Sequence, residues 1–432
     1  MLFMKSKDNY YKLMLDELFK PYLRIKPLDP EINLKNMKLL MKFLNNPEES
    51  FIQIHVAGTS GKTSTCYYLA SLLNNNKDLK VGLAVSPYVN EISERFQINF
   101  NKLNEKNVYL WFKKYTKIIA KFDKELSYFD LIYSFSIWYF NKQKVDYAVI
   151  ETGIGGRLDP TNVLGSPNKV CVITDIGYDH QEILGKTLPE IAYQKVGIVK
   201  RNNILITYSK SPNIMRVFKN WTKEVNAKIN IFDQKDKDVR LNNIIEYNQL
   251  ADYQQKNFNL ALRTYEYISK RDHLKKLDNN NLLESLSINI PGRMEIEHLK
   301  DNSILILDGA HNTQKIKTFL NSLNSKYPGY VPVILIAISH KKNYQKILDQ
   351  IIKTKAFIIL TKFKSNDSMP IRAIEPINLE KYLNKVGYRD YLKSDNLNKA
   401  LKIFLNKDNH LKVVTGSFYL ISEVKKKLNL SS

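Results

Sequence analysis

Cysteine and long apolar runs are scarce in this sequence of 432 residues. Its two cysteines, Cys66 and Cys171, exclude a disulfide framework and fit a reducing compartment, so we expect a cytoplasmic protein with both thiols in its core. No apolar run approaches the ~20 residues that a membrane-spanning helix needs, so no membrane partner is expected. Residues 1–12 mix charged and aromatic side chains, which is unlike a secretory signal.

Acidic side chains are also few, since 43 Asp and Glu face 66 Lys and Arg and give a formal charge of +23. Such an excess of cations indicates nucleic-acid binding when the cations cluster. Here the lysines are spread over most segments and accompanied by many Asn and Ile, which favours a bias in coding. Attraction of an anionic substrate and binding of a nucleic acid remain alternative explanations of the charge.

Apolar runs of strand length alternate with stretches of helical period, and this order predicts an α/β fold with mostly parallel sheets. Strands are expected at residues 51–57, 80–85, 145–151, 169–175, 303–307, 331–337, 356–361 and 411–415. Helices are expected at 62–73, 105–122, 129–141, 188–199 and 250–268, and residues 271–285 read as a polar connection. We therefore predict a P-loop nucleotide-binding domain at residues 1–290 and a smaller, Rossmann-like α/β domain at residues 291–432.

A glycine-rich turn, GTSGKT at residues 58–63, separates the first expected strand from the helix that follows it. Glycines let backbone N–H groups turn toward phosphate oxygens, and a helix N-terminus favours an anion. Lys62 would neutralise the β- and γ-phosphates, and the Thr63 hydroxyl would reach Mg²⁺. Val56 occupies the first glycine position of the strict P-loop pattern. We predict ATP binding, although the loop alone does not distinguish an ATPase from a GTPase or a kinase.

Three further polar residues stand out by their positions. Glu151 ends an expected strand beside the glycine loop at 153–157, where a doubly wound sheet places its ligands. His180 follows another strand, and Lys195 interrupts an otherwise apolar helix. Taken singly, each has an ordinary alternative explanation: a turn that needs glycine, a surface histidine, and a lysine whose side chain snorkels to solvent.

Nine segments, taken together and in this order, resemble one family, the Mur ligase superfamily, and within it folylpolyglutamate synthase/dihydrofolate synthase. They are residues 55–64 (HVAGTSGKTS), 86–88 (SPY), 94–99 (ERFQIN), 146–163 (DYAVIETGIGGRLDPTNV), 173–200 (ITDIGYDHQEILGKTLPEIAYQKVGIVK), 254–257 (QQKN), 291–293 (PGR), 308–312 (DGAHN) and 414–420 (VTGSFYL). The resemblance covers nearly the whole chain. It implies a Mur-ligase-type ATP-binding domain followed by a C-terminal domain of the same family.

The resemblance further implies an ATP-dependent amide ligase that activates a carboxylate as an acyl phosphate, which an amine then attacks. The substrates would be ATP, L-glutamate and a folate or dihydropteroate. ATP would contact Gly58, Thr59, Ser60, Gly61, Lys62, Thr63, Ser64, Asn257, Arg293, Asp308 and His311, and would lie between the two domains. Two Mg²⁺ ions would be held, one by Thr63, Ser86 and Glu151 and the other by His180 and Lys195, the latter carbamylated by CO₂. The catalytic residues would be Lys62, Glu151, His180 and Lys195.

Several alternatives remain open. The chain could be another Mur-type ligase acting on a cell-wall precursor, a basic nucleic-acid-binding ATPase, or a nucleotide-binding protein without activity. The segments SPY and ERFQIN favour the folate branch, which implies a monomer that binds small molecules and no nucleic acid. The sequence departs from the family pattern at Asp130, at Gln194 and at residues 339–343.

Overall fold

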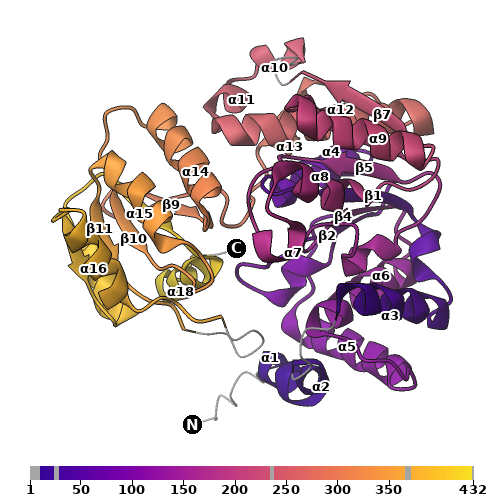
Figure 1. Cartoon of the computed structure of the whole chain (residues 1–432), viewed down its shortest axis with the longest axis horizontal. Coiled ribbons are helices and arrows are strands. Elements are labelled where there is room, and N and C mark those ends of the chain that lie inside the picture. The colour runs from indigo at the N-terminus through magenta and orange to yellow at the C-terminus, as the bar shows by residue number, and fades with distance from the viewer. Residues whose placement is uncertain (1–9, 24–28, 234–237, 365–370, 431–432) are drawn as a thin grey trace, which may run out of the picture. The chain divides into compact units, whose positions relative to one another are not determined.

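The computed structural model describes residues 10–23, 29–233, 238–364 and 371–430, and these form two compact units (Figure 1). The first unit comprises Met1–Ser86, Ile92–Arg240 and Asn257–Leu286, and the second Pro87–Glu91, Leu241–Lys256 and Ser287–Ser432. The single division expected at residues 290 and 291 stays a prediction. Each unit is built on its own mostly parallel β-sheet, which confirms the predicted α/β class.

The first unit contains a seven-stranded sheet in the order β3-β2-β4-β1-β5-β6-β7. The β3–β2 pair is antiparallel and the remaining pairs are parallel. The strands are β1 Ile52–Ala57, β2 Val81–Ala84, β3 Gln97–Ile98, β4 Tyr147–Glu151, β5 Val170–Ile173, β6 Ile204–Tyr208 and β7 Lys228–Phe232. β4, β5 and β6 are buried along their whole length, as expected of parallel strands covered on both faces.

Helices cover both faces of this sheet, and Figure 1 shows α4, α12 and α13 on one side and α3, α5 and α6 on the other. The helices of the first unit include α1 Tyr10–Leu13, α2 Lys20–Leu23, α3 Pro30–Phe43, α4 Lys62–Asn74, α5 Glu105–Ile119, α6 Tyr128–Lys142, α7 Gln181–Leu184, α8 Leu188–Val196, α9 Pro212–Glu224 and α13 Asn279–Leu286. α12 (Asp252–Asp272) continues from the second unit into the first. A capping box of Ser127 and Asp130 begins α6, because each side chain accepts a hydrogen bond from the other's backbone N–H.

The expected polar connection at residues 271–285 is wrong in its second half, because α13 forms there. Leu282 and Leu286 share one buried face of this helix, so the run of asparagines that precedes them hides a helical period. Asn75 fixes the helix to α4 by donating hydrogen bonds of 3.3 Å to the carbonyl oxygen of Asn281 and of 2.9 Å to Ser285 Oγ.

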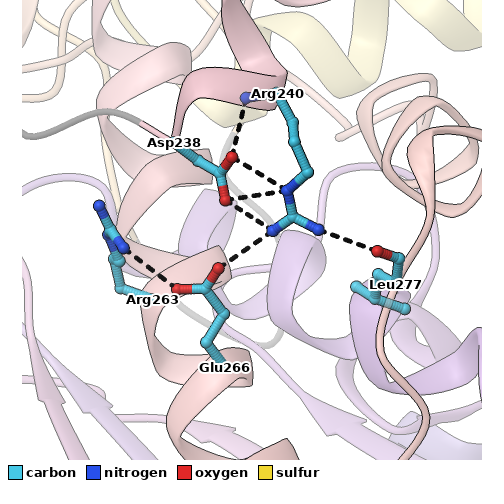
Figure 2. A network of polar contacts seen from close by, with 5 residues as sticks. All are labelled: Asp238, Arg240, Arg263, Glu266 and Leu277. Atoms are coloured by element: carbon cyan, nitrogen blue, oxygen red, sulfur yellow. Dashed lines mark hydrogen bonds and ion pairs between the residues drawn. The ribbon is translucent and has the colours of Figure 1, made fainter.

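The chain before α13 is held to α12 by the polar network of Figure 2. Arg240 donates to the carbonyl oxygen of Leu277 at 2.9 Å, and its guanidinium forms ion pairs with Asp238 (2.6 Å) and Glu266 (3.1 Å). Glu266 also pairs with Arg263 at 3.3 Å. Hydrogen bonds from Arg240 are the largest cause that lowers the pKa of Asp238 to about 2.

The second unit contains a six-stranded sheet in the order β12-β11-β10-β13-β9-β8, in which only the β8–β9 pair is antiparallel. Its elements are α11 Ile245–Gln249, β8 Glu295–His298, β9 Ile304–Asp308, α14 Thr313–Lys326, β10 Val333–Ile336, α15 Tyr344–Ile351, β11 Phe357–Leu360, α16 Pro376–Lys385, β12 Tyr391–Lys393, α17 Leu397–Asn406, β13 Leu411–Thr415 and α18 Phe418–Leu428, while α10 Val239–Asn242 crosses the division. Alternate residues of its strands enter two apolar clusters, as Ile306 and Leu305 do. The unit is thus a sheet covered on both faces.

All eight strands expected from the sequence are present, with ends shifted by at most two residues. β3, β6, β7, β8 and β12 were not expected. Cys66 and Cys171 are both buried and unpaired with each other, as predicted, and burial raises the pKa of each thiol. Among the described residues, no helix combines the length and apolarity that crossing a membrane requires.

Candidate functional site

The predicted phosphate loop lies between the end of β1 and the start of α4, and the segment after β5 holds it in place. The backbone N–H of Thr59 donates to the carbonyl oxygen of Asp175 at 2.7 Å, and its hydroxyl donates to that of Gly177 at 3.0 Å. Thr174 Oγ1 donates to the carbonyl oxygen of Ser60 at 2.7 Å. These bonds fix a turn whose backbone N–H groups and helix N-terminus suit an oxyanion.

Two glycines of the loop are required by close approaches. Gly61 has a φ of +85°, and a Cβ there would lie 2.4 Å from Oδ1 of Asn257 on α12. A Cβ at Gly58 would lie 1.8 Å from Oγ1 of Thr174. The structure therefore brings Asn257, a predicted adenine contact, directly against the phosphate loop, although 196 residues separate it from Gly61 in the sequence. Larger residues at either glycine would displace this arrangement.

Two ammonium groups meet at the carbonyl oxygen of Gly58. Nζ of Lys62 donates to it at 3.1 Å, and Nζ of Lys195 at 2.9 Å. Lys195 is 3% exposed, so the alternative of a side chain that snorkels to solvent does not hold. Two cations that share one acceptor repel each other, and an anion between them would relieve the repulsion. The loop is therefore electrostatically suited to a phosphate group.

Glu151 ends β4 with its carboxylate buried beside the start of α4. Thr63 Oγ1 donates to its two carboxylate oxygens at 2.9 and 3.1 Å, and the backbone N–H of Ser86 donates to Oε2 at 3.0 Å. The Tyr133 hydroxyl donates to the carbonyl oxygen of Glu151 and fixes the strand end. Thr63, Ser86 and Glu151, three of the predicted metal ligands, are thus brought together. Their oxygen atoms are of the type that Mg²⁺ prefers.

Asp159 organises the glycine loop at residues 153–157, a role that the sequence did not assign. Its carboxylate accepts hydrogen bonds from the backbone N–H groups of Ile154 (2.7 Å) and Thr161 (3.0 Å). Burial raises the pKa of this carboxyl, whereas the hydrogen bonds it accepts act in the opposite direction. Phe129 packs so closely on the loop that a Cβ at Gly153 would lie 2.5 Å from its ring. The loop is therefore a built structure and not only a turn that needs glycine.

His180 has its ring beside carboxylates of its own chain neighbours, Asp179 and Glu182. It follows β5 with a φ of +50° and has Nε2 4.0 Å from Oδ1 of Asp179 and Nδ1 3.7 Å from Oε1 of Glu182. Its side chain is 34% exposed. In the described part of the chain, no three His, Cys, Asp or Glu side chains are grouped in a way that could hold a metal ion. The second predicted metal site, which combines His180 with Lys195, therefore stays a prediction.

The second unit gathers its predicted residues at the end of β9. Asp308 is buried and accepts hydrogen bonds of 2.9 Å from the Tyr253 hydroxyl and from the backbone N–H of Met294. Burial raises the pKa of Asp308, and the charge of Arg293 partly offsets this. Nδ1 of His311 lies 2.7 Å from the carbonyl oxygen of Gly309. Asp308, Arg293 and His311 thus belong to one local arrangement.

Phe418 is the residue of this group that the sequence analysis did not single out, although it belongs to the segment VTGSFYL. The guanidinium of Arg293 lies 4.1 Å from the centre of its ring, and the His311 ring is 5.7 Å away in an edge-on orientation. Gly309 leaves room for the ring, because a Cβ there would lie 1.9 Å from it. Phe418 therefore contacts two of the predicted nucleotide-binding side chains through its ring, the guanidinium of Arg293 over its face and the imidazole of His311 edge-on.

Two family models together match residues 56–430. The model of the Mur ligase middle domain matches residues 56–297, and that of the dihydrofolate synthetase C-terminal domain matches residues 292–430. The first match contains the phosphate loop, the Glu151 group and Lys195, and the second contains Arg293, Asp308, His311 and Phe418. Each group of residues described above thus falls within one of the two matches.

Complete relatives are similar over nearly their whole length. A dihydrofolate synthetase of Saccharomyces cerevisiae is 26% identical over 423 residues, with 91% of this chain and 97% of the relative covered. A folylpolyglutamate synthase of Lacticaseibacillus casei is 29% identical over 415 residues, covering 90% and 92%. The structure of Mycobacterium tuberculosis folylpolyglutamate synthase complexed with ADP superimposes with a TM-score of 0.82 at 22% identity, over 97% of this chain and 98% of that one. At this identity the structure supports the fold.

Proposed function

We propose that this protein, which belongs to the Mur ligase family because the middle-domain model matches residues 56–297, is an ATP-dependent amide ligase. It joins L-glutamate to a folate or to dihydropteroate through an acyl-phosphate intermediate. The observation that carries the proposal is the group formed by Thr63, Ser86 and Glu151 beside a phosphate loop with two lysines. The names of the full-length relatives, dihydrofolate synthetase and folylpolyglutamate synthase, support the choice of substrates.

In this proposal the phosphate loop, residues Gly58 to Ser64, binds the phosphates of ATP. The transfer of the phosphate to a carboxylate brings two anions together, so it needs a cation beside them. Lys62 supplies that cation when its ammonium group moves from the carbonyl oxygen of Gly58 to the transferred phosphate. Asn257 contacts the adenine, and its closeness to Gly61 supports this role. Arg293, Asp308 and His311 bind the nucleotide from the second unit, with the guanidinium of Arg293 oriented by Phe418.

The residues present fit Mg²⁺ at one position, because the Glu151 carboxylate and the Thr63 hydroxyl already face each other as buried oxygen donors. We propose that Thr63, Ser86 and Glu151 hold a first ion, and that His180 and carbamylated Lys195 hold a second. Bound Mg²⁺ would supply positive charge that screens the phosphate oxygens. Carbamylation would convert Lys195 from a cation to an oxygen donor. The burial of its ammonium group beside Lys62 supports this step.

The experiment measures phosphate release from the purified full chain with Mg-ATP and L-glutamate, in parallel with dihydropteroate and with tetrahydrofolate as acceptor. Release that requires glutamate and one of these acceptors supports the ligase and identifies the activity that dominates. Release that requires neither acceptor contradicts the folate assignment. In that case a cell-wall precursor becomes the first acceptor to test, because the family membership is unaffected.

We further propose that the protein acts in the cytoplasm as a monomer and does not bind nucleic acid. The names of the full-length relatives, dihydrofolate synthetase and folylpolyglutamate synthase, are those of enzymes with small-molecule substrates and support the last point. Light scattering tests the oligomeric state. Oligonucleotide titration at two salt concentrations tests the last point, because binding through many phosphate contacts falls steeply as salt rises.

A further inference from the structure

A basic pocket lies in the first unit, and its lining contains no residue of the phosphate loop. It has a volume of about 630 Å³ and is bordered by α3, by the loop before residue 163, by the chain that follows α8 and by the end of α9. Lys38, Arg157 and Arg201 contribute three positive charges to its lining, and Lys200 adds a fourth when it is protonated, against one negative charge from Glu224. Among the described residues, none of the four cations forms an ion pair with a carboxylate.

Lys200 is the half-buried cation of this pocket. Its Nζ donates a hydrogen bond of 2.6 Å to the carbonyl oxygen of Asn162, which is itself a lining residue. Behind it lies Lys169, which is fully buried and donates to the carbonyl oxygens of Leu164 (2.8 Å) and Ile198 (2.7 Å). Burial is the largest cause that lowers the pKa of Lys200 to about 7, and the charges of Lys169 and Lys38 add to it.

A cation held in a hollow by carbonyl oxygens, with further cations around it, is poorly neutralised by the chain itself. An oxyanion placed at Lys200 would gain charge-assisted hydrogen bonds and would relieve the repulsion among the cations. Apolar walls stand beside the cations, since Val199 and Trp221 line the same pocket. The Trp221 ring is fixed, because its Nε1 donates to the carbonyl oxygen of Val199 at 2.9 Å. The pocket thus combines an anion-attracting end with a rigid aromatic wall.

We propose that this pocket is a second oxyanion site, which takes the phosphate group of a small phosphorylated organic molecule. Lys200, Lys38, Arg157 and Arg201 surround the phosphate, and Trp221 packs against the organic part. The site does not include a residue of the phosphate loop or a proposed metal ligand, although Arg157 also ends the glycine loop beside Glu151. Its occupation would therefore add to, and not compete with, nucleotide binding at Lys62.

The test is calorimetric titration of the full chain with inorganic phosphate and, separately, with phenyl phosphate at constant ionic strength. Both titrations are made in a Lys62→Ala background, which weakens the phosphate loop and leaves the pocket intact. We expect one equivalent of each ligand to bind, with phenyl phosphate the tighter because its ring contacts the apolar wall. A double variant, Lys38→Ala/Arg201→Ala, should bind about tenfold more weakly, since each partly exposed cation contributes a factor of about three to five.

The matched control is the double variant Lys42→Ala/Lys223→Ala, which removes two exposed cations from α3 and α9 that do not line the pocket. Its affinity should equal that of the parent. Equal weakening in both double variants would show that only net charge matters and would overturn the proposal, as would the absence of binding. Equal affinity for the two ligands would contradict the proposed packing of Trp221 against an organic group and would indicate a site for free phosphate. Because binding is the readout, failure of the ligase assay would not affect any of these outcomes.

Discussion

Lys62 and Lys195 donate to the same atom, the carbonyl oxygen of Gly58, at 3.1 and 2.9 Å, although one begins α4 and the other lies near the end of α8. Two ammonium groups so placed repel each other, and Lys195 has given up almost all contact with solvent. Carbamylation of Lys195 would replace one of the two cations by an anion. It would also relieve the repulsion at that carbonyl, where Lys62 would remain as the one cation of the pair.

Replacing Lys195 by Ala tests this relationship. We expect the rate of phosphate release to fall by about 100-fold or more, because the carbamate that would hold the second Mg²⁺ is lost. Small carboxylates such as acetate should restore part of the rate, since they can occupy the place of the carbamate. Lys186→Ala, which removes an exposed lysine near the start of α8, is the control and should be fully active. An unrescued Lys195→Ala variant with full activity would remove this residue from the mechanism.

Replacing Glu151 by Gln should raise the Mg²⁺ concentration needed for half-maximal activity and lower the maximal rate about 100-fold. The side chain keeps its shape but loses its charge, and only one of its two terminal atoms, the amide oxygen, can still accept a hydrogen bond from Thr63 or Ser86. Mg²⁺ titrations of phosphate release measure both quantities. Thr63→Ser keeps the hydroxyl that faces Glu151 and is the control. An unchanged Mg²⁺ requirement in Glu151→Gln would contradict the proposed metal ligand.

Gly61→Ala should abolish nucleotide binding, because the new Cβ meets the Asn257 side chain at 2.4 Å and the φ of +85° adds strain of ~1 kcal/mol. Gly329→Ala is a matched control for the strain alone, since its φ is +81° and no atom lies within 4 Å of the new Cβ. Both variants should lose some stability to thermal unfolding. Binding of an ATP analogue should be lost only in Gly61→Ala, and equal binding by the two variants would refute the role of the close approach.

Lys425→Met should lower the free energy of unfolding by roughly 3–5 kcal/mol, because it leaves the Glu295 carboxylate buried without its cation. The side chains of Lys425 and Glu295 are 2% and 1% exposed. Glu295 also accepts a hydrogen bond of 2.9 Å from the backbone N–H of Gly292, beside Arg293, so weakened nucleotide binding should accompany the loss. Guanidinium denaturation measures the change. Lys426→Met, at an exposed neighbouring position, should leave stability within about 0.5 kcal/mol of the parent.

The sequence was informative where a motif and a strand end coincide. The phosphate loop and Glu151 each follow an apolar strand, and parallel strands place their carboxyl ends at one edge of the sheet, so their neighbourhood could be predicted. Phe418 could not be assigned a role in this way, because its ring acts on Arg293 and His311 from more than 100 residues away. α13 was missed for another reason: its polar residues outnumber the two leucines that define its buried face.

The basic pocket shows the same limit of sequence reading. Lys38 and Arg201 lie outside the nine segments of the family pattern, and Arg157 and Lys200 lie within two of them without an assigned role. Only the folded chain shows the environment of the two lysines at the base of this pocket. Lys169 is fully buried, and Lys200 is half-buried, and each donates to a backbone carbonyl oxygen. Scattered positive charge therefore conceals a local cluster, and composition alone favours the explanation by coding bias.

Lys200→Met should change how stability depends on pH. The pKa of Lys200 is lowered to about 7 in the folded chain, chiefly by burial and then by Lys169 and Lys38, while Cys171 and Glu48 act weakly in the opposite direction. In the unfolded chain the pKa returns to ~10.4, so between pH 7 and pH 10 the unfolded state binds more protons and the stability of the wild type rises with pH. Below pH 7 the cost of burying this ammonium group is complete.

Lys200→Met removes that cost, so the variant should be more stable than the wild type at pH 6, by at most about 5 kcal/mol, and the difference should shrink toward pH 10. Urea unfolding of both proteins at pH 6, 8 and 10 measures the difference. Lys223→Met, which removes an exposed lysine of α9, should show no such trend. A difference in the free energy of unfolding between the two proteins that does not vary with pH would mean that Lys200 keeps its proton throughout the range. The oxyanion site would then rest on a permanently charged lysine, and phosphate affinity should vary with pH only as the phosphate itself loses its second proton.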